Sequence, residues 1–223
     1  MRKLCLTIIL LIGFSKVLFA QFGNCTASEM QTYTDHETGN TITILTDTLK
    51  NDRFLYQTDP MWTSDGKYLL FRSSSRGNGE KIERTLPNGE KRSWTPTQIY
   101  FIEMATGQII QATEGPDLGS AFLANKSNRM FISRKEKEDW NLYVMNLDKF
   151  FADVKKGKVG KPAAYETLLG TFPTNMGRPG GYAIDCNDDY AYITVEREGT
   201  EEEKERMAKN AFLPESNQPV KIK

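Results

Sequence analysis

Arginine, tyrosine and aspartate are the side chains of this sequence best suited to chemistry, because it holds a single histidine. That residue, His36, lies in the polar stretch YTDHETGN, which is typical of an exposed turn with a solvated side chain. The sequence has no HExxH helix, no cysteine and histidine cluster with metal-ligand spacing, and no glycine-rich phosphate loop. The residues present therefore predict no metal site and assign no catalytic residue.

Arg53, Tyr56 and Arg178 are instead the candidate substrate-binding residues, with Asp59 beside them. An arginine fork donates two parallel hydrogen bonds to a carboxylate, and a tyrosine offers a sugar ring an apolar face and a polar edge. The candidates lie in or beside two stretches, NDRFLYQ and PTNMGRPGG, that read as connections between strands. Each residue alone is equally compatible with a surface turn that holds no ligand. Whether the residues form a site depends on the strands and turns that position them.

Those elements repeat along the chain. Pro60, Ala121 and Tyr182 open three segments that align without a gap at an offset of 61 residues, PMWTSDGKYLLFR, AFLANKSNRMFIS and YAIDCNDDYAYIT. Each reads as a short strand, a polar turn and a second strand, because the middle residues favour turns and the flanking ones are aromatic or β-branched. The spacing predicts three equivalent antiparallel hairpins in three separate sheets.

A second strand pair, QIYFIEMATGQIIQATEG, completes the unit and predicts an all-β fold of four-stranded antiparallel blades. Repeats of this period are typical of a β-propeller, and a β-sandwich with similar hairpins is the alternative. We expect blade 1 at about 59–113, blade 2 at about 118–169, and blade 3 from about 177, ending where its third strand should begin. The lone strand NTITILTD would complete the last blade. About two and a half blades cannot close a ring, so 21–223 is interpreted as the N-terminal part of a propeller domain.

The first twenty residues are predicted to be a signal peptide, with Arg2 and Lys3 before the apolar run 4–14 and cleavage after Ala20. The run is short for a membrane span, which favours cleavage over a retained anchor. We therefore expect an exported protein, periplasmic or secreted, without a stable membrane anchor. Equal numbers of basic and acidic residues, 29 each, give no reason to expect nucleic-acid binding. Cys25 and Cys186 are equally compatible with a disulfide and with free thiols.

Two long insertions are predicted between the second and third strands of a blade. Residues 73–97 contain Asn88-Gly89, a hairpin turn signal. Residues 196–219 contain Thr200 and Glu203 at capping-box spacing and favour a helix, with a charged loop as the alternative. Blade connectivity places these insertions on the face that receives Arg53, Tyr56 and Arg178.

Four segments resemble the N-terminal part of the oligogalacturonate lyases: TGNTITILTD, NDRFLYQTDPMWTSDGKYLLF, IYFIEMATGQIIQATEG and the glutamate-rich stretch after YAYITVE. The resemblance covers about 33–223, although the strand and turn pattern is shared with TolB-type and prolyl-oligopeptidase-type propellers. It implies a seven-bladed propeller that cleaves pectin-derived oligouronides by β-elimination. In that family a manganese-type metal, held by several histidines and a glutamine, neutralises the carboxylate, and a histidine removes the proton.

The resemblance carries no catalytic or metal residue onto this chain, because the family places those residues in later blades. It implies an oligouronide substrate, with Arg53 and Tyr56 in the segment that matches the family's first inter-blade loop. The chain itself is therefore expected to be inactive even if it belongs to a lyase. A noncatalytic TolB-like propeller that binds a protein or a glycan is the alternative, and a prolyl-oligopeptidase-type propeller is a third.

Overall fold

The structure is a computed structural model that describes residues 22–77, 81–85, 89–116, 118–137, 139–172, 176–197 and 217–221. The predicted signal peptide and the helix predicted after Thr200 lie outside these ranges. Within them, no helix has the length and apolar character needed to cross a membrane.

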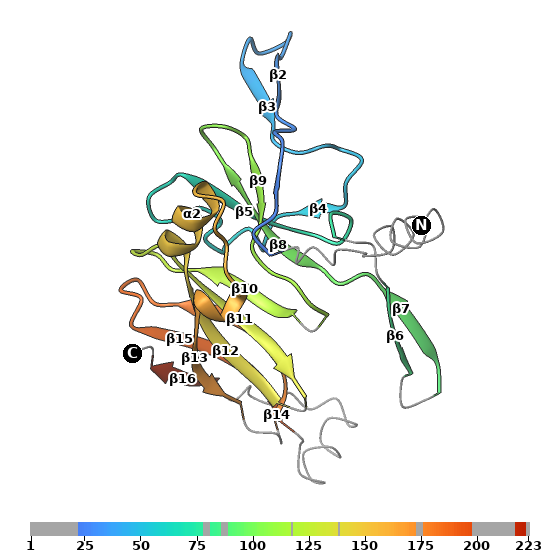
Figure 1. Ribbon diagram of the computed structural model, residues 1–223, viewed down its shortest axis with the longest axis vertical. Coiled ribbons are helices and arrows are strands. Elements are labelled where there is room, and N and C mark those ends of the chain that lie inside the picture. The colour runs from blue at the N-terminus through green and yellow to red at the C-terminus, as the bar shows by residue number, and fades with distance from the viewer. Residues whose placement is uncertain are drawn as a thin grey trace, which may run out of the picture.

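Three antiparallel sheets follow one another in chain order, and the third lies beside the second (Figure 1). The first has the strand order β1 (Cys25–Thr26), β9 (Ile109–Gln111), β8 (Gln98–Glu103), β5 (Tyr68–Ser73), β4 (Asp52–Arg53). The second has the order β10 (Leu118–Leu123), β11 (Arg129–Glu136), β12 (Asp139–Asn146), β13 (Glu166–Thr171). The third has the order β14 (Met176–Ile184), β15 (Tyr190–Arg197), β16 (Asn217–Lys221). The all-β prediction is confirmed, and the ring and its blade count stay predictions.

The predicted hairpins occur once in each sheet and share one register. Trp62 pairs with Leu69 in the first sheet, and the pairs one and two repeats later are Leu123 with Met130 and Ile184 with Ala191. The closing hydrogen bonds are equivalent too, each 3.0 Å from N to O: Thr63 to Tyr68, Ala124 to Arg129, and Asp185 to Tyr190. The 61-residue repeat of the sequence is therefore a repeat of backbone pairing.

The first two sheets place apolar side chains on both faces, so each needs a neighbour on either side. In the first sheet, Leu70 and Phe101 face a core shared with the second sheet, whereas Phe71 and Tyr100 face the opposite way. Phe122 and Phe131 belong to another cluster that reaches Ala191 of the third sheet. This alternation follows from the two-residue period of a strand. Because both faces of a sheet are then apolar, neighbouring sheets stack face to face.

Hydrogen bonds between turns join neighbouring sheets at one end. The carboxylate of Asp188, 2% exposed, accepts from the backbone N–H of Asn125 at 2.6 Å, from that of Lys126 at 2.9 Å, and from the Ser127 hydroxyl at 3.0 Å. Between the first two sheets, the Ser64 hydroxyl donates to Oδ1 of Asn128 at 2.8 Å. The ends of the sheets that carry these turns are thus held together.

Helix α2 (Leu147–Lys155) fills the space between the first two sheets, and the sequence analysis did not predict it (Figure 1). Its signals are present in the sequence, because Asn146 caps the backbone N–H of Lys149 and Leu147, Phe150, Phe151 and Val154 follow helical spacing. Phe151 stacks on Tyr68 with ring centroids 3.7 Å apart. The short 3-10 helix η1 (Pro162–Ala164) leads into β13.

The structure adds three strand pairings that the sequence analysis did not include. The strand expected to stand alone is β3 (Thr41–Ile44), which pairs with β2 (Gln31–Thr34) in a hairpin at one end of the molecule (Figure 1). The third repeat has a third strand, because β16 pairs with β15. The first sheet begins earlier than residue 59, because β4 already pairs with the end of β5. β4 and β16 each pair with a strand that lies beyond a long intervening segment, which propensity alone does not specify. The β2–β3 hairpin is a local pairing that the sequence analysis missed.

Arg76 clamps the N-terminal segment onto the first sheet. Its guanidinium, 6% exposed, donates to both carboxylate oxygens of Asp52 and to both of Glu29, with Nε 2.8 Å from Oδ1 of Asp52 and Nη1 2.9 Å from Oε1 of Glu29. It also lies 5.3 Å from the ring centre of Phe71. Nearby, burial raises the pKa of Tyr100 to about 12, so this phenol is neutral. The segment around Glu29 therefore covers the outer face of the sheet.

The hydrogen bonds that Asp188 accepts from the turn beginning at Asn125 predict that Asp188→Asn destabilises the protein. The amide keeps one acceptor but loses the charge and sets an NH2 group against backbone donors, so we expect a loss of about 2 kcal/mol in the free energy of unfolding. Asparagine tolerates the positive φ of 64° at this position, so backbone strain does not enter. Urea unfolding checks this, and Asp189→Asn, at an exposed neighbour, is the control. Equal stabilities of the two variants would contradict the assignment.

The clamp predicts a pH-dependent effect for Glu29→Gln. The hydrogen bonds from Arg76 outweigh burial and hold the pKa of Glu29 below its ordinary value of 4.5. The stabilisation is therefore fully present above 4.5 and is lost as pH falls through the lower folded-state pKa. Melting temperatures of wild type and variant should differ at pH 7 and converge below pH 4. The exposed Glu37→Gln serves as the control, and a constant difference at every pH would refute the ion-pair explanation.

Candidate functional site

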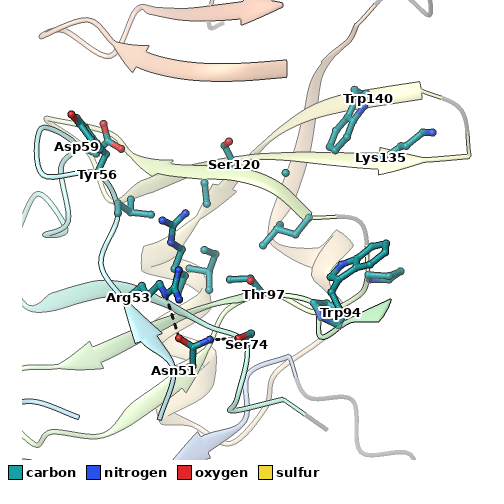
Figure 2. Close-up of a pocket in the computed structure, with 18 of the residues that line it drawn as sticks. Asn51, Arg53, Tyr56, Asp59, Ser74, Trp94, Thr97, Ser120, Lys135 and Trp140 are labelled. Carbon is teal, nitrogen blue, oxygen red and sulfur yellow. Dashed lines mark hydrogen bonds between the residues drawn. The ribbon is translucent and has the colours of Figure 1, made fainter. Parts of the chain in front are cut away.

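A cleft of about 990 Å³ opens between the first and second sheets (Figure 2). It lies near the C-terminal end of β5 and beside the hairpin formed by β6 (Ile82–Thr85) and β7 (Lys91–Trp94). The connection 73–97 was predicted to carry such a hairpin, and the structure confirms it. The volume is at the upper end of the range of roughly 300–1,000 Å³ typical of ligand sites. The cleft is therefore large enough for more than a single small ion.

Arg53 and Arg72 lie side by side on two paired strands that border this cleft. They are register partners in β4 and β5, and both line the cleft. Nε of Arg53 donates to Oδ1 of Asn51 at 3.2 Å, and Nδ2 of Asn51 donates to the Ser74 hydroxyl at 2.8 Å (Figure 2). Asn51 thus orients Arg53 without neutralising it.

Positive charge dominates the described lining of the cleft. Arg53, Arg72, Arg84 and Lys135 are cationic, and Asp59 is the acidic residue among the described lining side chains. Neither Arg53 nor Arg72 has a carboxylate within ion-pair distance in the part of the chain that the structure describes. Like charges on paired strands repel each other, and a concave surface of one sign concentrates the opposite ion. The cleft is therefore suited to an anionic ligand.

Aromatic rings occupy both ends of the cleft. Tyr56, 67% exposed, lies near Arg53 and Asp59 (Figure 2). Trp94 and Trp140 line the cleft away from that end, and Trp140 also packs against the cluster of Phe122 and Phe131. Rings with an apolar face and polar edge suit a ligand that is partly apolar and partly hydrated. The cleft thus combines cations with flat apolar surfaces.

The structure brings together two of the three predicted binding residues. Arg53 and Tyr56 line one cleft with Trp94 and Thr97 of the 73–97 connection, as the connectivity predicted. Arg53 is in strand β4, however, and not in a connection. The backbone of Arg178 belongs to β14 of the third sheet, between the register pairs Met176 with Arg197 and Pro179 with Val195. Its role in binding remains a prediction.

Sequence reasoning overlooked Arg72, Trp94 and Trp140. Arg72 interrupts an otherwise apolar strand, YLLFRS, and a charge in that position was a usable signal. Trp94 lies in the predicted insertion 73–97, but its position in the sequence gave no sign that it belongs to a site. Trp140 pairs with Lys135 across β11 and β12, and the sequence analysis did not predict this register.

The described residues do not fit a manganese centre. No group of three histidine, cysteine, aspartate or glutamate side chains converges within the described ranges. His36 lies at an exposed turn between β2 and β3, away from the residues that line the cleft. Cys25 and Cys186 are free and exposed, which settles the question of their pairing.

The unneutralised arginine pair predicts that Arg53→Gln stabilises the protein. Removing one of two facing cations relieves their repulsion, so we expect a gain of up to about 0.5 kcal/mol at low salt that disappears at high salt. Thermal melting at two ionic strengths measures it. Arg92→Gln, beside Glu90 on the exposed hairpin, is the control and should give no gain. A loss of stability in Arg53→Gln at low salt would show that its charge is balanced.

Two solved structures of oligogalacturonate lyases share this fold. One, an oligogalacturonate lyase in complex with manganese, is 19% identical, with a TM-score of 0.56 over 79% of this chain and 38% of its own. The other, the oligogalacturonate lyase of Vibrio parahaemolyticus, is 18% identical, with a TM-score of 0.54 over 78% of this chain and 38% of its own. No family model and no curated protein matches the sequence. The chain spans less than half of the length of these structures, and the part that aligns shares its all-β fold with the oligogalacturonate lyases.

Proposed function

We propose that the cleft between the first and second sheets binds an acidic oligosaccharide of the oligogalacturonate type, as part of an oligogalacturonate lyase-like protein. The observation that carries this proposal is the pair Arg53 and Arg72, which face the cleft from adjacent strands without a carboxylate counterion among the described residues. A uronate carboxylate would lie between the two guanidinium groups and accept hydrogen bonds from both.

The surroundings of the pair favour a sugar acid over a simple anion. Tyr56 and Asp59 lie at the same end of the cleft as Arg53 (Figure 2). Asp59 can accept hydrogen bonds from sugar hydroxyls, and the Tyr56 ring offers an apolar face to the sugar. The structural likeness to two oligogalacturonate lyases supports the same substrate class. Arg178 is retained as a second carboxylate contact in this proposal.

In this proposal the chain supplies substrate binding and not the elimination itself. β-Elimination needs the carboxylate to be neutralised and a base to remove the neighbouring proton, and each contributes orders of magnitude in rate. The described residues form neither a metal centre nor a histidine base in the cleft. We therefore assign no step of the elimination to them. The apolar N-terminal run makes export of the protein part of the same proposal.

Binding measurements on the chain 21–223 test the proposal. Calorimetric titration with tetragalacturonate should show binding, and a neutral galacto-oligosaccharide of equal length should bind much more weakly. Arg53→Gln and Arg72→Gln should each lower the affinity roughly tenfold, because a hydrogen bond to a charged group contributes about 1.5–3 kcal/mol. Arg92→Gln, outside the described lining, should leave it unchanged.

The outcomes separate the alternatives. Equal affinity for the acidic and neutral ligands would contradict an acidic-sugar site and favour a general glycan-binding propeller. No binding of either sugar would refute the proposal. Formation of unsaturated product by this chain with a divalent metal would show that the elimination machinery lies within it, against the division of roles proposed here.

A further inference from the structure

We propose that Asn51 determines the preference of the cleft for acidic ligands, because its neutral amide orients Arg53 and leaves the positive charge of that arginine available. This inference rests on the proposed function, since it assumes that the ligand is an acidic oligosaccharide. A carboxylate at this position would hold Arg53 equally well but would cancel its charge. Asn51 is thus a positioning residue that acts through Arg53.

Asn51 is itself held by the segment that follows β5. Its backbone N–H donates to the Ser75 hydroxyl at 2.8 Å, and Nδ2 of its side chain donates to the Ser74 hydroxyl at 2.8 Å (Figure 2). The backbone N–H of Ser75 donates in turn to the hydroxyl of Ser73, the last residue of β5, at 3.2 Å. Because Nδ2 is used by Ser74, Oδ1 is the atom of the amide that remains for Arg53.

The contact with Asn51 engages one nitrogen of the Arg53 guanidinium and leaves the other two available. Nε donates to Oδ1 of Asn51 at 3.2 Å, whereas Nη1 and Nη2 make no hydrogen bond to another residue within the described ranges. These two terminal nitrogens form the fork that pairs with a carboxylate. Fixing Nε also lowers the conformational entropy that the arginine loses when a ligand binds. Asn51 therefore prepares Arg53 for a carboxylate without occupying the fork.

The acidic residues nearest to Arg53 in the sequence leave its charge unbalanced. Asp52 precedes Arg53 in β4, and its carboxylate is bound by Arg76 on the other face of the strand. Asp59 lines the same end of the cleft as Arg53 but forms no ion pair with Arg53 or Arg72 within the described chain. The neutral partner Asn51 is therefore what keeps this end of the cleft positive while Arg53 stays oriented.

Asn51→Asp separates the effect of charge from that of position. Aspartate has nearly the same size as asparagine, and its second oxygen can accept a hydrogen bond from the Ser74 hydroxyl. The new ion pair would relieve the repulsion between Arg53 and Arg72. We therefore expect this variant to gain stability and to lose affinity for an acidic ligand, whereas the loss of a merely structural contact would lower both.

The test is calorimetric titration at pH 7 and low salt with tetragalacturonate and with a neutral galacto-oligosaccharide of equal length. Asn51→Asp should lower the affinity for tetragalacturonate roughly tenfold, as expected for Arg53→Gln, and should leave the weaker binding of the neutral ligand unchanged. Its melting temperature should rise by about 1–2 °C at low salt. The matched control is Asn40→Asp, which adds the same charge at an exposed position that does not line the cleft.

Asn51→Ala tests the orienting role separately. It removes the acceptor for Nε and keeps the charge of Arg53, so the affinity for tetragalacturonate should fall roughly fivefold because the arginine must be ordered on binding. In an Arg53→Gln background the same substitution should cause no further loss, since Asn51 acts through Arg53. Circular dichroism checks that each variant is folded.

The results distinguish this inference from the proposed function. If Arg53→Gln weakens binding of tetragalacturonate and both Asn51 variants bind it as wild type does, the role of Asn51 is refuted and the proposed function stands. If wild type binds no uronide, both are refuted. If Asn51→Asp weakens the acidic and neutral ligands equally, or if Asn51→Ala costs as much affinity in the Arg53→Gln background as in wild type, Asn51 only supports the fold and the inference is overturned.

Discussion

The constraint on which this structure depends is that its first two sheets are apolar on both faces. Adjacent residues such as Leu70 and Phe71 are both almost fully buried, although they point in opposite directions from β5. A sheet of this kind is stable only between two neighbours. The second sheet, helix α2 and the segment clamped by Arg76 are the neighbours that the first sheet acquires. Stacking of the sheets is thus a direct consequence of the burial pattern of single strands.

The same constraint explains where the cleft lies. The sheets are joined through their short turns, where Ser64 contacts Asn128 and Asp188 contacts the turn that begins at Asn125. Along β5 the buried run ends at Phe71 and is followed by Arg72. From that point the facing walls carry polar, charged and aromatic side chains and leave a hollow between them. In β5 a closed core at one end and a charged cleft at the other follow from this change in residue type.

The site combines rigid elements with one projecting element. Arg53 and Arg72 are on paired strands, so their separation is determined by the ladder and not by side-chain flexibility. Trp140 is held over Gly119 by the second sheet. Trp94 instead belongs to a hairpin, β6–β7, that projects from the sheet (Figure 1). Functional residues on such projections vary most readily while the scaffold remains unchanged, and this division suits a fold whose repeats are otherwise alike.

The sequence by itself determined the hairpins of the three repeats, because their pairing involves residues only a few positions apart and the turn residues specify the register. It also indicated the insertion that carries Trp94 and placed Arg53 and Tyr56 on the correct side of the fold. It did not determine the pairing of Arg53 with Arg72, because β4 is too short to show a strand pattern. Nor did it bring Trp94 and Trp140 to one cleft, because their strands are separated by others in the sequence. Nor did it place β3 beside β2, or reveal β4, whose two residues are too few to show a periodic pattern. The β2–β3 hairpin is a local pairing that the sequence analysis missed, and β4 depends on pairing within the first sheet. Tertiary structure decided the cleft, since its lining depends on which sheet packs against which, and that is a property of both apolar faces together.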